Sequence, residues 1–317
     1  RVWGQLLPFL DGTQFALDPG SSDGVTYAGV TINGLDRRAF IWSTTPGSPP
    51  PQILPPLPGF DRSMAHDASR DWRVIVGRSV SGSGQEELVT PTRWVHGVPE
   101  EIAAPPGYFD ASATEVSADG TAMIGYAGDG RRMTVGVLWR EGHAPVVIRG
   151  PRDAAITVPY AVSGDGSTVV GWSRNDRYIG YIDRPWLWTL RTGTLDLNEL
   201  VGQLGGGFTN WRVMNPSFIT PDGQTLVGGG FHNGLYESYV MTLPELCPAD
   251  FDNDGDTANG GMPNFAVGVE DLVYFLAQFE VGDAHLDLDD GSGTGQGDNA
   301  VTIDDLLYFL THFEAGC

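Results

Sequence analysis

The sequence contains no lysine at all, and its 18 basic residues are all arginines. Without lysine the chain has no residue for Schiff-base catalysis and none for a phosphate-binding loop of the Walker type. It also lacks any run of about eighteen consecutive apolar residues, so we expect no segment to span a membrane as a helix. These absences exclude several classes of enzyme and a helical membrane anchor within this sequence.

Acidic residues outnumber basic ones, and the excess is concentrated near the C-terminus. The chain has 40 acidic and 18 basic residues, a net charge of −22. Residues 247–317 hold 15 of the acidic residues and no arginine, whereas residues 1–246 have a net charge of −7. Such a field repels nucleic acid and anionic lipids and attracts divalent cations. The change of composition near Pro244 predicts two domains, residues 1–246 and 247–317.

Only two cysteines occur, Cys247 and Cys317, and they lie at the two ends of the acidic segment. This placement predicts one disulfide that closes the segment, with two unpaired thiols as the alternative. In the chain-entropy description such a bridge contributes about 4 kcal/mol. Disulfides persist in oxidising compartments, so we expect a secreted, extracellular or cell-surface protein. The sequence begins inside a repeat unit, described below, because Arg1 matches part of it. We therefore expect a mature chain whose leader has been removed.

A nine-residue phrase recurs five times in the first 246 residues. Its copies read SSDGVTYAG, SRDWRVIVG, SADGTAMIG, SGDGSTVVG and TPDGQTLVG. Their aspartates are Asp23, Asp71, Asp119, Asp165 and Asp222, so successive copies are 48, 48, 46 and 57 residues apart. Short polar side chains and glycine favour a tight turn, and β-branched residues follow it. Each phrase therefore predicts a β-hairpin.

A further strand with a large apolar residue near its end follows each phrase. The equivalent residues are Trp42, Trp94, Trp139, Trp188 and Met241. One more short apolar stretch comes next, such as QILPPL or TLDLNEL, which makes four strands per repeat. This pattern predicts a mainly β fold, a five-bladed β-propeller of four-stranded blades, with the tryptophans in the core between blades.

The N-terminal QLLPFL matches the fourth strand of a blade, and the last repeat lacks one. We therefore expect the two ends of the chain to close the ring together. Residues 1–3 match the end of a third strand that the last repeat already supplies, so they are surplus. They indicate either a partial sixth blade or an end that is left for a neighbouring molecule.

The phrase VSADGTAMIG, followed by GVLW, resembles the HAF-type repeats of bacterial extracellular proteins. It differs from the Asp-box of sialidases, which has one residue between the aspartate and the glycine. The resemblance covers most of the first 246 residues. It implies a secreted propeller and no specific activity.

The acidic segment contains a second repeat. DFDNDGD and VGVEDLVYFLAQFE in its first copy correspond to DLDDGSG and VTIDDLLYFLTHFE in its second copy. Acidic loops that open a helix are typical of calcium sites, because Ca²⁺ takes roughly six to eight oxygen ligands, and an insert separates each loop from its helix here. The candidate ligands are Asp250, Asp252, Asp254, Asp256, Asp271, Asp287, Asp289, Asp290, Asp298 and Asp305.

Both copies end on aspartate where an EF-hand has glutamate, and in this respect they resemble dockerins. The frame CPADFDNDGD to FEAGC, with its DLDDGSGTG loop, resembles the GC-type dockerin-like tails of secreted planctomycete proteins. This resemblance covers essentially all of residues 247–317. It implies an EF-hand-like α-helical module that binds calcium and serves attachment or assembly, without implying a cohesin-type partner.

The two copies predict helices over residues 270–279 and 304–313, each with leucine and aromatic residues on one face. We expect these faces to pack on each other. Alternatively, Tyr274, Phe275, Tyr308 and Phe309 form a docking surface. A solvated acidic spacer is the alternative to the whole module, although such spacers contain few aromatic residues.

Enzyme motifs are absent from the sequence: it has no nucleophile elbow, HExxH, CxxC pair or phosphate loop. His66, His96, His143 and His232 lie at unrelated positions of the repeat. We therefore favour a non-catalytic extracellular protein, whose propeller presents surface and whose calcium-stabilised tail anchors or assembles it. One alternative is a self-polymerising filament subunit that uses the tail or the N-terminal strand. The other is a secreted carbohydrate-active hydrolase or lyase, which requires carboxylates and histidine at one mouth of the ring.

Overall fold

The chain folds mainly into β-strands, as predicted. The computed structural model describes residues 14–17, 26–33, 36–84, 87–130, 133–151, 154–174, 183–189, 192–204, 206–243, 247, 249–251, 267–282, 286–293, 295, 297 and 300–315. Within these ranges strands run from Gln14 to Thr242, and two longer helices follow. No helix in them is long and apolar enough to cross a membrane.

The strands form antiparallel sheets in chain order. Sheet 1 consists of β1 (Gln14–Leu17), β2 (Thr26–Asn33), β3 (Asp36–Ser43) and β4 (Gln52–Leu54). Sheet 2 consists of β5 (Arg62–Ala68), β6 (Val74–Ser81), β7 (Leu88–Val95) and β8 (Val98–Glu101). Sheet 3 consists of β9 (Phe109–Val116), β10 (Ala122–Gly128), β11 (Thr134–Arg140) and β12 (Val146–Ile148). Sheet 4 consists of β13 (Ile156–Val162), β14 (Thr168–Arg174), β15 (Asp183–Thr189) and β16 (Gly193–Asp196). Sheet 5 consists of β17 (Trp211–Ile219), β18 (Thr225–His232) and β19 (Leu235–Thr242).

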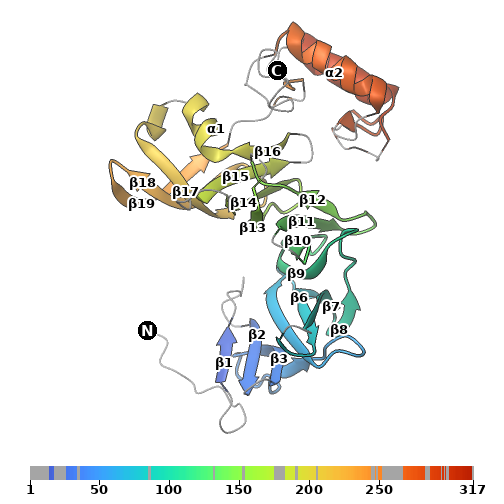
Figure 1. The fold of residues 1–317 in the computed structure, drawn as a ribbon, viewed down its shortest axis with the longest axis vertical. Helices are drawn as coiled ribbons and strands as arrows, with labels where there is room; N and C mark the ends of the chain where they lie inside the picture. The colour runs from blue at the N-terminus through green and yellow to red at the C-terminus, as the bar shows by residue number, and fades with distance from the viewer. Residues whose placement is uncertain are drawn as a thin grey trace.

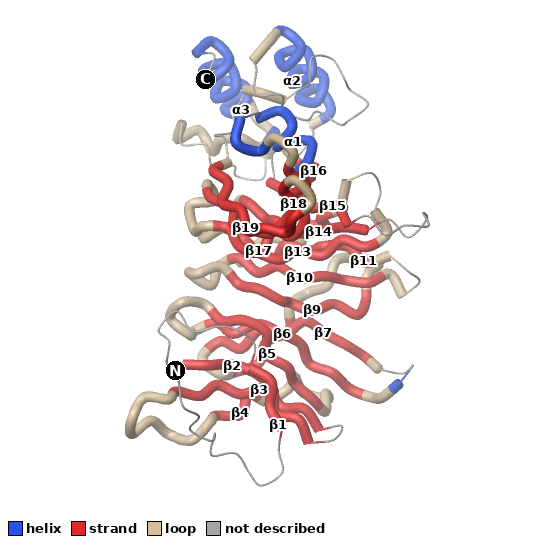
Figure 2. The backbone as a smooth tube through the Cα atoms, turned by 90° about the vertical axis from the view of Figure 1, so that its left-hand side faces the viewer, coloured by secondary structure: helices blue, strands red, loops and turns tan. Residues whose placement is uncertain are grey.

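The sheets follow one another along an arc, and each packs on the next (Figure 1). In the side view the strands run across the long axis and the helices gather at one end (Figure 2). A parallel bridge between Thr134 and Ile156 joins sheets 3 and 4, so that β9 to β16 form one continuous eight-stranded sheet. Sheets 1 and 5 lie at opposite ends of the arc (Figure 1). The QLLPFL segment that was predicted to close a ring, together with residues 1–3, lies outside the described residues.

Each described copy of the repeated phrase forms the turn between the first two strands of a sheet, as predicted. In sheet 3 the Ser117 hydroxyl donates to Asp119 Oδ1 (2.7 Å) and accepts the Ala122 N–H (2.9 Å). Asp119 Oδ1 also accepts the Thr121 N–H (2.9 Å), and equivalent bonds recur in sheets 2, 4 and 5. Burial raises the pKa of the Asp119 carboxyl, but these hydrogen bonds outweigh it and hold that pKa below its usual value. The phrase is a structural turn, and its first copy, with Asp23, lies outside the described residues.

In sheets 2 to 5 the glycine that ends the phrase faces a bulge in the first strand of the sheet. At this point the pairing between the first and second strands shifts by one residue. A Cβ on Gly77 or Gly125 would lie 1.9 Å from a backbone oxygen of the first strand. On Gly171 or Gly228 the same distance would be 2.3 Å. A side chain at this position would therefore push the two strands apart.

The large apolar residues of the repeat lie between sheets, as predicted. Trp94 is 0% exposed, Trp139 is 3%, Trp188 is 4% and Met241 is 1% exposed. The indole N–H groups of Trp94 and Trp139 each donate to a backbone carbonyl that follows the preceding sheet, at 2.7 Å. Trp42, whose sheet has no other described sheet before it, is only half-buried.

The segment predicted to be the fourth strand of sheet 4, residues 194–200, is a strand and a helix instead. β16 ends at Asp196, and α1 (Leu197–Leu204) begins directly after it, followed by a short 3₁₀ helix. Leu197, Leu200 and Val201 are buried against sheets 4 and 5, at the spacing of one helix face. This inserted helix accounts for the longest spacing between phrases, 57 residues.

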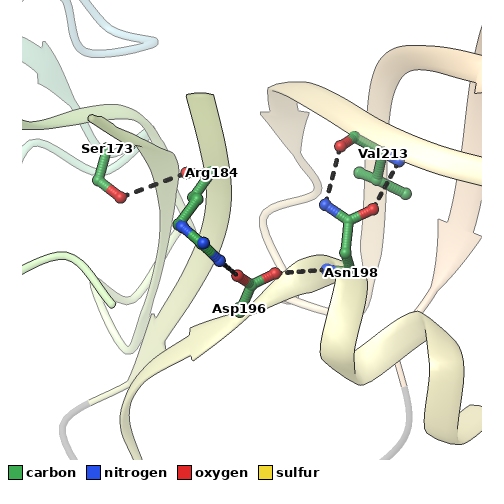
Figure 3. Close-up of polar contacts among 5 residues, drawn as sticks. All are labelled: Ser173, Arg184, Asp196, Asn198 and Val213. Atoms are coloured by element: carbon green, nitrogen blue, oxygen red, sulfur yellow. Dashed lines mark hydrogen bonds and ion pairs between the residues drawn. The ribbon is translucent and has the colours of Figure 1, made fainter. Parts of the chain in front are cut away.

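Polar contacts fix α1 between the two sheets (Figure 3). Asp196 Oδ1 accepts the Asn198 N–H (2.9 Å) and so caps the helix, while Asp196 Oδ2 lies 3.2 Å from Arg184 Nη1. The Asn198 side chain accepts the N–H of Val213 (2.9 Å) and donates to its carbonyl (3.0 Å). The end of sheet 4 and the start of sheet 5 are thus held together through the first turn of α1.

The C-terminal unit contains the two predicted helices, α2 (Val269–Val281) and α3 (Ile303–Ala315). Phe275 and Phe309 are both 0% exposed, and their stacked rings have centroids 4.0 Å apart. The hydrophobic cluster around them contains residues of the C-terminal unit alone. The predicted packing of the two helices is therefore confirmed, and these two phenylalanines belong to a core rather than to a docking surface.

Candidate functional site

The loops before α2 and α3, together with the first turns of these helices, contain the ten aspartates that the sequence predicts to bind calcium. Four described ones are buried: Asp250, Asp271, Asp289 and Asp305 are 1%, 2%, 2% and 0% exposed. Two more are described, the half-buried Asp287 and the exposed Asp290. The remaining candidates, Asp252, Asp254, Asp256 and Asp298, lie outside the described residues.

The aspartates that end the two loops have equivalent environments. Asp271 Oδ1 accepts the Phe251 N–H (2.6 Å), and its Oδ2 accepts the Gly268 N–H (2.7 Å). Asp305 Oδ1 accepts the Leu288 N–H (2.5 Å), and its Oδ2 accepts the N–H three residues earlier in the chain (2.6 Å). Each carboxylate therefore ties the start of its loop to the first turn of its helix. This equivalence supports the sequence repeat as a structural one.

The carboxylate of Asp289 is surrounded by a glycine-rich loop. Its Oδ1 accepts the N–H groups of Gly291 and Gly293, both at 2.8 Å, and its Oδ2 accepts that of Gly295 at 2.7 Å. The three glycines have φ of 86°, 74° and 75°, a conformation that residues with a side chain rarely adopt. The alternating glycines of DGSGTGQG thus let the backbone wrap around one buried acidic group.

The described carboxylates suit a hard cation by their chemistry. Burying a carboxylate is costly unless its charge is compensated, and residues 247–317 contain no lysine or arginine. Backbone N–H groups occupy lone pairs of the oxygens but do not neutralise the charge. Among the described residues no three His, Cys, Asp or Glu side chains are grouped so as to hold a metal, and four candidate ligands lie outside that set. The oxygen-only donor set of these loops fits calcium.

The predicted disulfide between Cys247 and Cys317 is not tested, because Cys317 lies outside the described residues. Cys247 is close to the start of the first loop, where its carbonyl accepts the Asp250 N–H (3.1 Å). The bridge remains a prediction from the sequence.

A cavity lies where the first strands of sheets 2 to 5 converge. Its volume is about 360 Å³, and it is lined by three equivalent positions of the repeat. The residues one before the Ser or Thr of each phrase are apolar, and those two before and one after it are Asp67, Arg70, Glu115, Ala118, Ala161, Gly164, Phe218 and Pro221. Sheets 2 and 3 thus make one side of the cavity polar, and sheets 4 and 5 make the other side apolar. Alignment of the phrases would have identified these positions from the sequence.

The four histidines of the sheets occupy different kinds of position. His66 is in β5, His96 and His143 are in hairpin turns, and His232 is at the end of β18. The His232 ring stacks on Trp211, with centroids 4.8 Å apart, and its Nδ1 is 3.3 Å from a Glu237 oxygen. None of the described lining residues of the cavity is a histidine. Of the combination that the hydrolase alternative requires, the described lining residues supply the carboxylates, Asp67 and Glu115.

Comparisons with known proteins identify folds of the same general kind. No protein family matches the sequence, and no curated protein does. TolB from Acinetobacter baumannii is 13% identical, with a TM-score of 0.44 over 69% of this chain and 49% of its own, so this chain spans about half its length. A putative TolB from Agrobacterium tumefaciens is 19% identical, with a TM-score of 0.41 over 71% of this chain and 73% of its own. The β-propeller domain of the Trilobed protease from Pyrococcus furiosus, described as having an open velcro topology, is 10% identical, with a TM-score of 0.37 over 72% and 82%. These likenesses concern a mainly β, propeller-like fold and extend to no activity.

Proposed function

We propose that the chain is a non-catalytic extracellular protein, in which a propeller of five blades presents a binding surface and a calcium-stabilised tail anchors or assembles it. The domains are residues 1–246 and the dockerin-like module 247–317, closed by a disulfide between Cys247 and Cys317. The repeats of residues 1–246 are of the HAF type. The single observation that carries the proposal is the burial of four carboxylates in a unit without lysine or arginine.

The proposal assigns a different role to each group of aspartates. Asp271 and Asp305 fasten loop to helix through backbone N–H groups, and their carboxylates close the two sites. Asp252 and Asp254 in the first loop, and Asp287 with Asp298 in the second, supply further oxygens. Bound calcium supplies the positive charge that the module lacks. Loss of the ion would leave several like charges close together, so the module should loosen.

Calcium titration of the full chain tests the proposal. We expect the parent protein to release or absorb heat on titration with calcium, and to melt at a higher temperature in calcium than in chelator, because a ligand that binds only the folded state stabilises it. The double variant Asp252→Asn with Asp254→Asn should lose most of this heat and of the shift in melting temperature.

A matched control separates this effect from a general loss of charge. Glu101→Gln with Glu141→Gln also removes two negative charges, at exposed positions in β8 and in the turn after β11, and should leave the titration unchanged. Equal melting of the parent in calcium and in chelator, without heat on titration, would contradict the calcium assignment.

A further inference from the structure

Sheets 2 to 4 each present the same row of positions to the sheet that follows them, with an apolar residue at its centre. In sheet 4 the row consists of Ala161, Val170 and Leu187, which pair across β13, β14 and β15. These residues are 7%, 0% and 3% exposed, because they pack against sheet 5. The central residues of the same row in sheets 2 and 3, Val76 and Ile124, are 0% exposed for the same reason.

Sheet 5 repeats this row, and no other described sheet covers it. Phe218, Val227 and Val240 stand at the equivalent positions and pair across β17, β18 and β19. Phe218 is 52% exposed and Val240 is 69% exposed. The pairing register places Phe231 and Tyr236, 39% and 57% exposed, on the same face. Exposed apolar side chains on the outer face of the last sheet of a repeat array indicate a contact surface, because terminal repeats otherwise carry a polar outer face.

The opposite face of each sheet packs on the row of the preceding sheet, and it carries a repeated pair of residues. Val169 with Trp188 in sheet 4 covers the row of sheet 3, and Leu226 with Met241 in sheet 5 covers the row of sheet 4. Sheet 1 carries the equivalent pair, Tyr27 and Trp42, on the face that has no described sheet before it. Both residues of this pair are half-buried. The two ends of the arc therefore present the two halves of the contact that the chain makes between its own sheets.

We propose that the outer face of sheet 5 binds sheet 1 of a second copy of this chain, head to tail. The occupant follows from continuity: this contact would repeat the sheet-to-sheet packing that occurs along the arc (Figure 1). The row in sheet 5 contains no charged residue, like the covered row of sheet 4. Because the two faces are different, the contact is heterologous, and it adds copies in one direction until the assembly closes or continues as a filament. This self-association is independent of the tail and of calcium.

Sedimentation velocity of the full chain across a dilution series, in the presence of chelator, tests the proposal. The parent should sediment faster as its concentration rises. Val240→Lys places an unpaired charge on the row and should weaken self-association by about tenfold or more. Leu235→Lys is the matched control, because Leu235 lies on the same strand, is 66% exposed and belongs to the opposite face. It should associate like the parent.

Mixing two variants tests the head-to-tail geometry. Trp42→Lys blocks the other end of the arc, and Tyr27→Lys serves the same purpose if Trp42→Lys lowers the melting temperature. Each blocked variant should be monomeric alone, whereas a mixture of Val240→Lys with the sheet 1 variant should form dimers that do not grow. A parent that stays monomeric at every concentration overturns the proposal, as does equal weakening by Val240→Lys and Leu235→Lys. Dimers of the sheet 1 variant alone would overturn the head-to-tail geometry, because they require two identical faces in contact.

Discussion

Glycine is required at the end of the repeated phrase because a neighbouring strand leaves no room for a side chain, and not because the backbone there has a positive φ. Gly125 has no positive φ, yet a Cβ there would lie 1.9 Å from the Ser112 carbonyl oxygen. The phrase predicts its turn correctly, since Ser-x-Asp-Gly chemistry acts within a few residues. The requirement for the final glycine depends on a bulge in another strand, and no local pattern reveals it.

We expect Gly125→Ala to lower the free energy of unfolding of the sheets by about 2 kcal/mol or more, because β9 and β10 must separate to admit the methyl group. Gly202→Ala is the control: Gly202 lies in α1 with open space around its Cα, and alanine favours a helix there by about 1 kcal/mol. Urea unfolding followed by tryptophan fluorescence measures both changes. If Gly125→Ala left the midpoint unchanged, the close approach of the two strands would be refuted.

Helix α1 shows how one short sequence can fit two elements. TLDLNEL alternates apolar and polar residues at first, as a strand does, and β16 uses that part. Leu197, Leu200 and Val201 follow a helical spacing and are buried together. Whether this segment continues as a strand or forms a helix depends on the space between sheets 4 and 5. The alternation of apolar and polar residues carries no information about that space. The local sequence signal for the helix is Asp196, a residue type that commonly caps helices.

Asp196→Ala should therefore destabilise the junction of sheets 4 and 5 by about 2 kcal/mol, because it removes the cap of α1 and leaves Arg184 without its buried partner. Asp196 is 5% exposed in this pair. Asp183→Ala is the matched control: it removes the ion pair with Arg174, whose side chains are each 30% exposed, and should cost less than about 1 kcal/mol. Chemical denaturation compares the two variants. Equal losses would show that the cap contributes nothing.

At the scale of the whole molecule, the sequence predicts the order of the sheets and the helical tail along the chain better than it predicts their arrangement in space. Repeat length and turn chemistry predict sheets in chain order and a separate helical tail, because both depend on local pattern. Whether the first and last sheets meet depends on small angles between sheets that add up along the chain, and no residue pattern encodes their sum. The open arc, and the face of sheet 5 that no other described sheet covers, are consequences of this accumulated geometry.

The separate hydrophobic cluster of the tail predicts two independent unfolding transitions. Phe309→Ala should cost the module about 4 kcal/mol, since Phe309 is 0% exposed and stacks on Phe275. A loss of this size is comparable to the whole stability of so small a unit, so differential scanning calorimetry should show the tail transition disappear while the transition of the sheets keeps its temperature. Leu307→Ala, two residues earlier in α3 and 55% exposed, should leave both transitions in place. A single transition that shifts as one unit in Phe309→Ala would mean that the tail and the sheets unfold together, and the division at residue 247 would then be wrong.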